Sequence, residues 1–143
     1  MIDISQKGVT VRRALAQGMI YFNKEGFKTV LTGKSPKGDL WEAAKLAGIG
    51  AAKLTPSLLP YCHPLALEKV QIQFEINKSK RCVKVTAEIL CSGKTGVEME
   101  SLAAVSAACL SLYDMMKWAG QDMMITDICL EHKSGGKKGT YQR

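Results

Sequence analysis

Two stretches of the chain alternate regularly between apolar and polar residues. In residues 67–76 and 82–90 every second side chain is apolar, which places the apolar side chains on one face of an extended strand. The apolar positions are Val70, Ile72, Phe74 and Ile76 in the first stretch and Val83, Val85, Ala87 and Ile89 in the second. The polar segment 77–80 between them predicts a turn, so the two strands should form an antiparallel hairpin.

Two other stretches show helical spacing. In residues 98–118 apolar residues recur at gaps of three and four and form one continuous stripe, which consists of Leu102, Val105, Cys109, Leu112 and Met116. Residues 39–54 also have an apolar side. Asp39 is placed to cap the start of that helix, and Pro56 and Pro60 are placed to end it.

The remaining pattern completes the fold class. Residues 9–22 are apolar and β-branched near both ends but small in the middle, so periodicity does not decide between strand and helix, and we favour a strand. Residues 123–132 alternate imperfectly and predict a last strand. The order strand, helix, strand, strand, helix, strand predicts an α+β fold, a ferredoxin-like sandwich whose antiparallel sheet carries its helices on one face. Residues 1–143 contain no linker, repeat or break in composition, which predicts a single domain.

The second side of helix 98–118 is made of small residues instead of charged ones. These residues are Ala103, Ala104, Ala107, Ala108 and Ser111. A helix exposed to water usually carries lysine and glutamate there, so another surface should pack closely against this side. A second subunit and a ligand cleft are both possible, and we favour a homo-oligomer.

The composition indicates an intracellular globular protein. Hydrophobic residues make up 46% of the chain and charged residues 23%, and no stretch is apolar enough to be a signal peptide or a membrane span. Five widely spaced cysteines predict free thiols in a reducing cytoplasm instead of a disulfide framework. His63 and His132 are the only histidines, and no cysteine or histidine pair has zinc-finger spacing, so no metal site is expected.

The formal net charge of +7 predicts an anionic partner. Lysines stand beside glycines in three segments, 34–38, 93–96 and 133–139, which fits either solvated loops or one site for a polyanion. The sequence Gly93-Lys94-Thr95 is similar to part of a phosphate-binding P-loop. The full motif requires a glycine at position 88, where this chain has Glu88, so a P-loop nucleotide hydrolase is excluded.

Acid–base chemistry has few candidates in this chain. His63 lies between two prolines on a stiff, non-helical backbone, which suits either a positioning group or a structural histidine. Glu100 and Asp114 lie within about 40° of each other around the axis of helix 98–118. Asp114 and Lys117 are i,i+3 neighbours and can form an ion pair. Such a pair is ordinary on a surface, but covering it would couple and shift both pKa values, as proton transfer at neutral pH requires.

Several stretches, taken together and in order, resemble one protein family. They are Lys37-Gly38-Asp39, residues 47–53, Leu59 to Leu65 with Cys62-His63-Pro64-Leu65, Gly93 to Leu102 with Gly96-Val97-Glu98-Met99-Glu100, Leu112 to Lys117, and Lys133-Ser134-Gly135-Gly136-Lys137. This pattern is similar to that of the molybdenum cofactor biosynthesis protein C family, the cyclic pyranopterin monophosphate synthases. The resemblance extends from about Asp3 to Gly139. Tyr61 stands where the family usually carries leucine, and Ser35-Pro36 precedes Lys37 where a histidine is often found.

The resemblance implies a ferredoxin-like fold, a hexamer built as a trimer of dimers, and active sites at subunit interfaces. It implies that 3′,8-cyclo-7,8-dihydro-GTP is converted to cyclic pyranopterin monophosphate and pyrophosphate without a metal or organic cofactor. Asp114 and Lys117 would then be the central acid–base residues, with Lys37 contributed by a mobile loop. The residues expected to line the substrate pocket are Tyr61, Cys62, His63, Met99 and Glu100. Those expected to hold the triphosphate are Arg12, Lys53, Lys133 and Lys137.

Two other functions are compatible with parts of the sequence. A basic ferredoxin-like domain is also the frame of an RNA-binding module, which would stack bases on aromatic side chains of the sheet. Aromatic residues make up only 6% of this chain, and the two clearest strands offer Phe74 alone. A non-catalytic assembly scaffold would explain the small-residue helix side but would leave the lysine-rich loops without a purpose.

Overall fold

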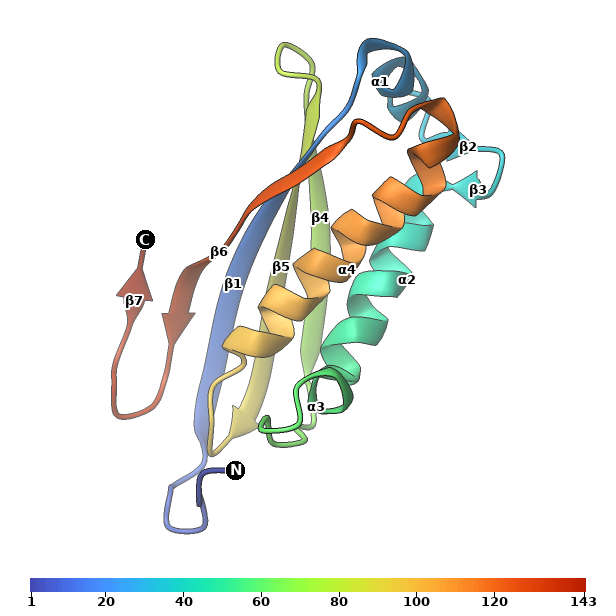
Figure 1. The fold of residues 1–143 in the computed structure, drawn as a ribbon. Coiled ribbons are helices and arrows are strands. Elements are labelled where there is room, and N and C mark those ends of the chain that lie inside the picture. The colour runs from blue at the N-terminus through green and yellow to red at the C-terminus, as the bar shows by residue number, and fades with distance from the viewer.

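The computed structural model describes all 143 residues and is built on one antiparallel sheet (Figure 1). Five strands lie in the order β4-β5-β1-β6-β7, with every neighbouring pair antiparallel. Their bounds are β1 Thr10–Tyr21, β4 Lys69–Asn77, β5 Cys82–Gly93, β6 Met124–Ser134 and β7 Tyr141–Gln142. The first four strands in this order form the ferredoxin-like arrangement predicted from the sequence.

Two long helices lie side by side across one face of the sheet, as Figure 1 shows. They are α2 (Leu40–Lys53) and α4 (Glu98–Met116), and the buried core lies between them and the strands. The shorter elements are α1 (Lys24–Val30), α3 (Thr55–Leu58), the 3₁₀ turn η1 (Lys117–Ala119) and a small hairpin of β2 (Lys34–Ser35) and β3 (Gly38–Asp39). None of the helices is long and apolar enough to cross a membrane.

The strand predicted over residues 9–22 is confirmed, and packing explains its small residues. Ala14, Ala16 and Gly18 face the helices and are buried. A Cβ atom on Gly18 would lie 2.7 Å from Cγ1 of Val105 on α4, which is closer than two carbon atoms can approach. Small side chains in β1 therefore let α4 lie close to the sheet.

The small-residue side of α4 has a different explanation from the one predicted. A Cβ atom on Gly48 of α2 would lie 3.0 Å from the carbonyl oxygen of Ala104, so α2 of the same chain packs closely against this side. Ala104 and Ala108 are fully buried in the single chain. The inference of a second subunit from these two residues is therefore wrong. The other three residues of that side, Ala103, Ala107 and Ser111, are only half-buried.

The other long elements are confirmed with small shifts at their ends. Asp39 caps α2 as predicted, because its Oδ1 accepts a hydrogen bond from the amide of Glu42 at 2.8 Å. α2 ends at Lys53, before Pro56, but a second short helix follows. Pro56 occupies the first turn of α3, where a missing amide hydrogen has no cost, so the prediction for Pro56 is only partly right.

The open face of the sheet offers no aromatic platform from Phe74. The ring of Phe74 packs against Trp41 of α2, with centroids 5.1 Å apart, and belongs to the hydrophobic packing beneath the helices. The one aromatic residue that the RNA-binding alternative relied on is therefore covered by the chain itself.

Candidate functional site

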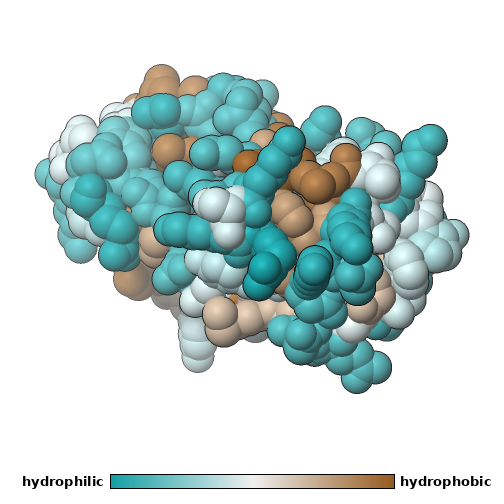
Figure 2. All heavy atoms as spheres, turned by 90° about the horizontal axis from the view of Figure 1, so that it is seen from above, coloured by the Kyte–Doolittle hydropathy of each residue, from teal (hydrophilic) through white to brown (hydrophobic).

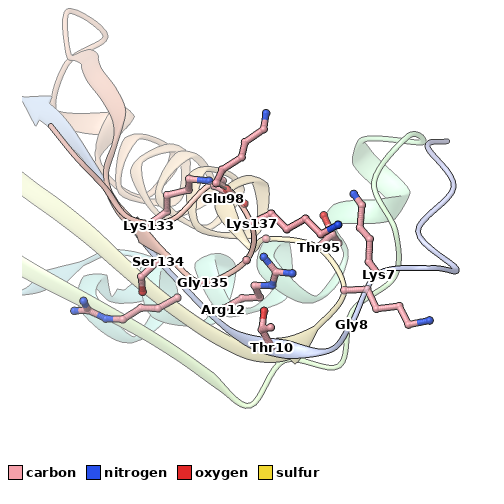
Figure 3. Close-up of a pocket in the computed structure, with 15 residues that line it drawn as sticks. Lys7, Gly8, Thr10, Arg12, Thr95, Glu98, Lys133, Ser134, Gly135 and Lys137 are labelled. Carbon is pink, nitrogen blue, oxygen red and sulfur yellow. Dashed lines mark ion pairs between the residues drawn. The ribbon is translucent and has the colours of Figure 1, made fainter.

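Two adjoining cavities lie beside the start of α4. The larger one, about 700 Å³, has no hydrophobic residue in its lining and is called the basic cavity below. Its lining consists of Lys7, Gly8, Thr10, Arg12, Arg13, Lys94, Thr95, Gly96, Glu98, Lys133, Ser134, Gly135, Gly136, Lys137 and Lys138 (Figure 3). Seven lysine or arginine residues and a single carboxylate residue thus line the cavity, which makes it attractive to a polyanion.

The smaller cavity, about 200 Å³, shares Lys7, Thr95, Gly96 and Glu98 with the basic cavity. Half of its whole lining is apolar, and the residues that it does not share are Ile2, Ile4, Tyr61, Cys62, His63, Leu65, Met99 and Glu100. We call it the side cavity. Because the two cavities share four residues, one elongated ligand can occupy both, with its charged part in the basic cavity and a flat, mixed-polarity part in the side cavity.

Glycines in the loop after β6 hold Arg12 in place. Gly135 and Gly136 have φ angles of +93° and +78°, which favour glycine. A Cβ atom on Gly136 would lie 1.6 Å from Nη1 of Arg12, so the loop backbone lies directly against the guanidinium. The Nε of Arg12 donates a hydrogen bond to the carbonyl of Gly93 at 3.1 Å. The loop and the end of β5 together aim Arg12 into the basic cavity.

Strand register brings Lys133 to the helix side of the sheet. Lys133 of β6 lies opposite Ala14 of β1, which faces the helices, so the lysine points toward the start of α4. Its amine lies 3.5 Å from Oε1 of Glu98. Figure 3 shows the two side chains meeting at the rim of the basic cavity.

Glu100 is the most buried charged group of the site. It is only 3% exposed, and burial, together with the nearby Glu98, raises the pKa of its carboxyl group. The same burial effect and the proximity of Glu100 raise the pKa of the Cys62 thiol. The side cavity thus contains a carboxyl group that is easier to protonate than usual and a thiol that is kept neutral.

Lys37, Asp114 and Lys117 form a cluster at the other end of α4. The amine of Lys37 lies 2.6 Å from Oδ2 of Asp114, and that of Lys117 lies 2.8 Å from Oδ1. Hydrogen bonds from Lys117 and Lys37 lower the pKa of Asp114 to about 2, and the Asp114 carboxylate raises the pKa of Lys117. The three side chains are about half exposed in the single chain. Figure 2 looks onto this end of the molecule, whose surface is mostly hydrophilic with small hydrophobic patches.

The lysine–aspartate cluster and the cavities are far apart within one chain. Glu100 and Asp114 are separated by 14 residues of α4. At about 1.5 Å of rise per residue this corresponds to about 21 Å along the helix axis. Figure 1 shows the same separation, with the start of α4 next to α3 and its end next to the β2–β3 hairpin.

The structure groups most of the predicted site residues. Arg12, Lys133 and Lys137 line the basic cavity. Tyr61, Cys62, His63, Met99 and Glu100 line the side cavity. Lys53 at the end of α2 lines neither cavity.

The sequence analysis missed several residues of the basic cavity as site residues. They are Lys7, Thr10, Arg13, Lys94 and Lys138. Lys94 and Lys138 belong to the lysine–glycine segments, and Lys7 precedes Gly8, so the same signal could have found all three. No group of three or more histidine, cysteine, aspartate or glutamate side chains is placed to hold a metal ion.

Comparison with known proteins gives a consistent result over the whole chain. The model of the MoaC family matches residues 1–136. A protein of Campylobacter lari named cyclic pyranopterin monophosphate synthase is 49% identical over 143 residues, which cover 100% of this chain and 91% of that protein. A protein of the same name from a Methylobacterium species is 47% identical over 141 residues, or 99% of this chain and 88% of the relative. The mitochondrial cyclic pyranopterin monophosphate synthase of Arabidopsis thaliana is 46% identical over the full chain, which spans 53% of that longer protein.

Proposed function

The chain belongs to the MoaC family, and on that premise we propose that it is a lyase of molybdenum cofactor biosynthesis. It converts 3′,8-cyclo-7,8-dihydro-GTP into cyclic pyranopterin monophosphate and releases pyrophosphate. The observation that carries this proposal is the pair of joined cavities, one strongly basic and one of mixed polarity, lined by eight of the twelve site residues predicted from the sequence.

The basic cavity binds the triphosphate in this proposal. A hydroxyl group of the substrate attacks the α-phosphorus and gives up its proton to water, and the new P–O bond closes the cyclic phosphate. The bond between the α-phosphorus and the oxygen that bridges it to the β-phosphate breaks, and that oxygen leaves with the pyrophosphate. Negative charge then collects on the departing pyrophosphate. Apart from Arg13, which pairs with Glu88, six basic residues line the cavity with one carboxylate and can neutralise that charge, so the step needs no metal ion in this mechanism.

The side cavity binds the guanine-derived ring. Met99 and Leu65 supply apolar contact, and His63 and Glu100 supply polar groups in its lining. The raised pKa of Glu100 favours a carboxyl group that can both donate and accept hydrogen bonds. The ring and the phosphate chain of one nucleotide then meet where the two cavities share Thr95 and Glu98.

Lys117 acts as the principal acid–base group, and Asp114 sets its pKa. Lys37 closes over the bound substrate. Opening the imidazole-derived ring and closing the pterin ring require repeated proton transfers. The ion pair holds Lys117 in its protonated form, because Asp114 raises the pKa of that amine. The geometry therefore suits Lys117 as a proton donor first. It becomes an effective base only when water is excluded or the pair with Asp114 is loosened.

A complete active site needs two chains. The cluster of Lys37, Asp114 and Lys117 is about 21 Å from the side cavity along α4, too far for a lysine side chain to span. We therefore propose a homo-oligomer in which the end of α4 of one protomer faces the start of α4 of the next, with the hexamer implied by the family resemblance as the expected assembly. The second chain would also supply the shielding that Asp114 and Lys117 lack in a single protomer.

A turnover assay tests the proposal directly. The purified protein is incubated with 3′,8-cyclo-7,8-dihydro-GTP, and the pterin product and pyrophosphate are quantified in parallel. Equal amounts of both products are expected from the wild type, and none from Lys117→Ala, which should still fold because Lys117 is half exposed. The five cysteines are unpaired, in keeping with a reducing cytoplasm, so the assay includes a thiol reductant. Unchanged nucleotide with correctly folded wild-type protein would contradict the proposed function.

A further inference from the structure

The N-terminal segment runs along both cavities. Ile2 and Ile4 line the side cavity, Gly8 lines the basic cavity, and Lys7 lines both. Lys7 is the one lysine or arginine that the two cavities share. Figure 3 shows its side chain rising beside Thr95, a residue of the loop between β5 and α4 that also lines both cavities. A positive charge thus stands where the two parts of the site join.

Local hydrogen bonds fix this segment against the site. Oδ1 of Asp3 accepts a hydrogen bond from the amide of Ser5 at 2.8 Å, and the amide of Lys7 donates to the carbonyl of Ile4 at 3.1 Å, which forms a tight turn. The amine of Lys94 donates to the carbonyl of Ser5 at 2.9 Å and so connects the turn to the loop before α4. Ile4 is the one half-buried side chain among residues 1–8, the others being exposed. The turn directs Lys7 toward the cavities.

Lys7 differs from Lys133 in its charge pairing. The amine of Lys133 is already paired with Glu98, whereas Lys7 forms no ion pair. An unpaired ammonium group on a flexible stem is a compact charge with three hydrogen-bond donors, which suits a phosphate oxygen. Glu98 and Thr95 are the other polar side chains that line both cavities, so Lys7 is the only cation among the shared residues.

We propose that Lys7 binds the phosphate nearest the ribose and thereby selects ligands in which the base and the phosphate chain belong to one nucleotide. The inference rests on the proposed function, which places the base in the side cavity and the triphosphate in the basic cavity. A nucleoside without phosphates makes no contact with the amine of Lys7. A ligand with a 5′-phosphate places its α-phosphate beside it, so Lys7 is a specificity-determining residue for the nucleotide substrate.

Binding measurements test the role of Lys7 without requiring turnover. Calorimetric titrations of the wild type, Lys7→Ala and Lys7→Arg use three probes: GTP, inorganic tripolyphosphate and guanosine. Lys7→Ala should weaken GTP about tenfold, as expected for one lost charge-assisted hydrogen bond, and leave guanosine unchanged. Lys7→Arg should restore most of the GTP affinity. Lys78→Ala, which removes an exposed lysine from the β4–β5 turn at the opposite end of the molecule, is the charge-matched control and should bind like the wild type.

The outcomes separate this inference from the proposed function. Wild-type affinity of Lys7→Ala for GTP overturns the role of Lys7 and leaves the cavity assignment intact. An equal loss for GTP and guanosine also overturns it, because the lysine would then only hold the N-terminal segment in place. Wild-type protein that binds neither GTP nor tripolyphosphate overturns both the inference and the proposed use of the basic cavity.

Discussion

The amine of Lys37 lies 2.6 Å from Oδ2 of Asp114, although 77 residues separate the two in the chain. Lys37 comes from the hairpin of β2 and β3, and Asp114 comes from the last turns of α4. Asn23 helps to hold these parts together. Its side chain accepts a hydrogen bond from the amide of Gly26 in α1 and donates one at 2.8 Å to Asp122 beyond η1.

The carboxylate of Asp114 should control the proton affinity of Lys117. Asp114→Asn removes the charge that raises the pKa of Lys117, so that pKa falls toward its ordinary value. If Lys117 donates a proton, the alkaline limb of the pH–rate profile, which lies above the ordinary lysine pKa of 10.5 in the wild type, should then move to lower pH. Turnover at neutral pH, where the amine stays protonated in both proteins, should change much less. The pH profile of kcat, measured between about pH 7 and pH 11.5 on both proteins, checks this.

Asp114 should not contribute an acidic limb to the pH–rate profile of the wild type. Because the pKa of Asp114 is about 2, this carboxylate stays ionised across the whole range and contributes no acidic limb. An unshifted alkaline limb in Asp114→Asn would show that Lys117 is not the titrating group. Glu25→Gln, which removes the exposed partner of Lys28 in α1, is the matched control and should leave the profile unchanged.

Gly136 should control the affinity for the triphosphate through Arg12. Gly136→Ala adds a Cβ atom 1.6 Å from Nη1 of Arg12, so the guanidinium has to leave its position in the basic cavity. We expect KM for the nucleotide to rise about tenfold while kcat changes much less, because one phosphate contact is lost. Gly139→Ala is the matched control, since Gly139 also has a positive φ angle but no atom within 4 Å of the added Cβ. An equal rise in KM for both variants would mean that backbone strain in the loop, and not displacement of Arg12, weakens nucleotide binding.

Glu88 should make the stability of the sheet depend on pH. On β5 it forms ion pairs with Lys69 of β4 and Arg13 of β1, and these partners lower its pKa below 4.5. A carboxyl group whose pKa is lower in the folded state stabilises the fold above its unfolded pKa and loses that contribution as the pH falls through the folded pKa. Glu88→Gln should therefore lower the free energy of unfolding by about 1 kcal/mol at pH 7 and by less near pH 3.

Urea denaturation at both pH values measures this difference. Glu75→Gln on β4 is the control, because Glu75 forms no ion pair and its substitution should have the same small effect at both pH values. A loss of stability for Glu88→Gln that persists unchanged at low pH would contradict an origin in the two ion pairs.

The sequence predicted the elements that have long periodic patterns and missed those set by a few residues. The alternation around Ile72 and Val85 predicted β4 and β5, and the apolar stripe predicted α4. Helix α1 was missed because seven residues are too few for a helical pattern, although Asn23 caps its start. The β2–β3 hairpin has two residues per strand and leaves no alternation to detect.

The site was predictable to the extent that charge and motif identify residues. The resemblance named Arg12, His63 and Glu100, which the structure places in the cavities. The position of Lys53 outside both cavities could not be predicted, because it depends on how α2 is oriented over the sheet. The small residues at Ala104 and Ala108 were attributed to a second chain, since a sequence pattern shows that a surface is covered but not by which partner.

The close contact between α2 and α4 should depend on one of two glycines in α2. Gly48→Ala places a Cβ atom 3.0 Å from the carbonyl oxygen of Ala104, an atom of a rigid helix backbone, and should lower the free energy of unfolding by about 1 kcal/mol. Gly50→Ala has no atom within 4 Å of the added Cβ and should instead stabilise the protein by about 0.5–1 kcal/mol through helix propensity. Thermal unfolding of the two variants compares them directly. Stabilisation by both would show that the helices can separate without cost.

Two variants that are each inactive should restore activity when they form one oligomer. Lys117→Ala retains its cavities, and Arg12→Glu retains its lysine–aspartate cluster about 21 Å away, so only a site built from two chains can combine the intact halves. Random mixing of equal amounts by co-expression should give about one quarter of the wild-type activity, because one in four composite sites receives both intact halves. Each variant expressed alone gives the residual activity and serves as the control. Activity of the mixture that does not exceed these controls would place the whole site within one chain and contradict the proposed interface.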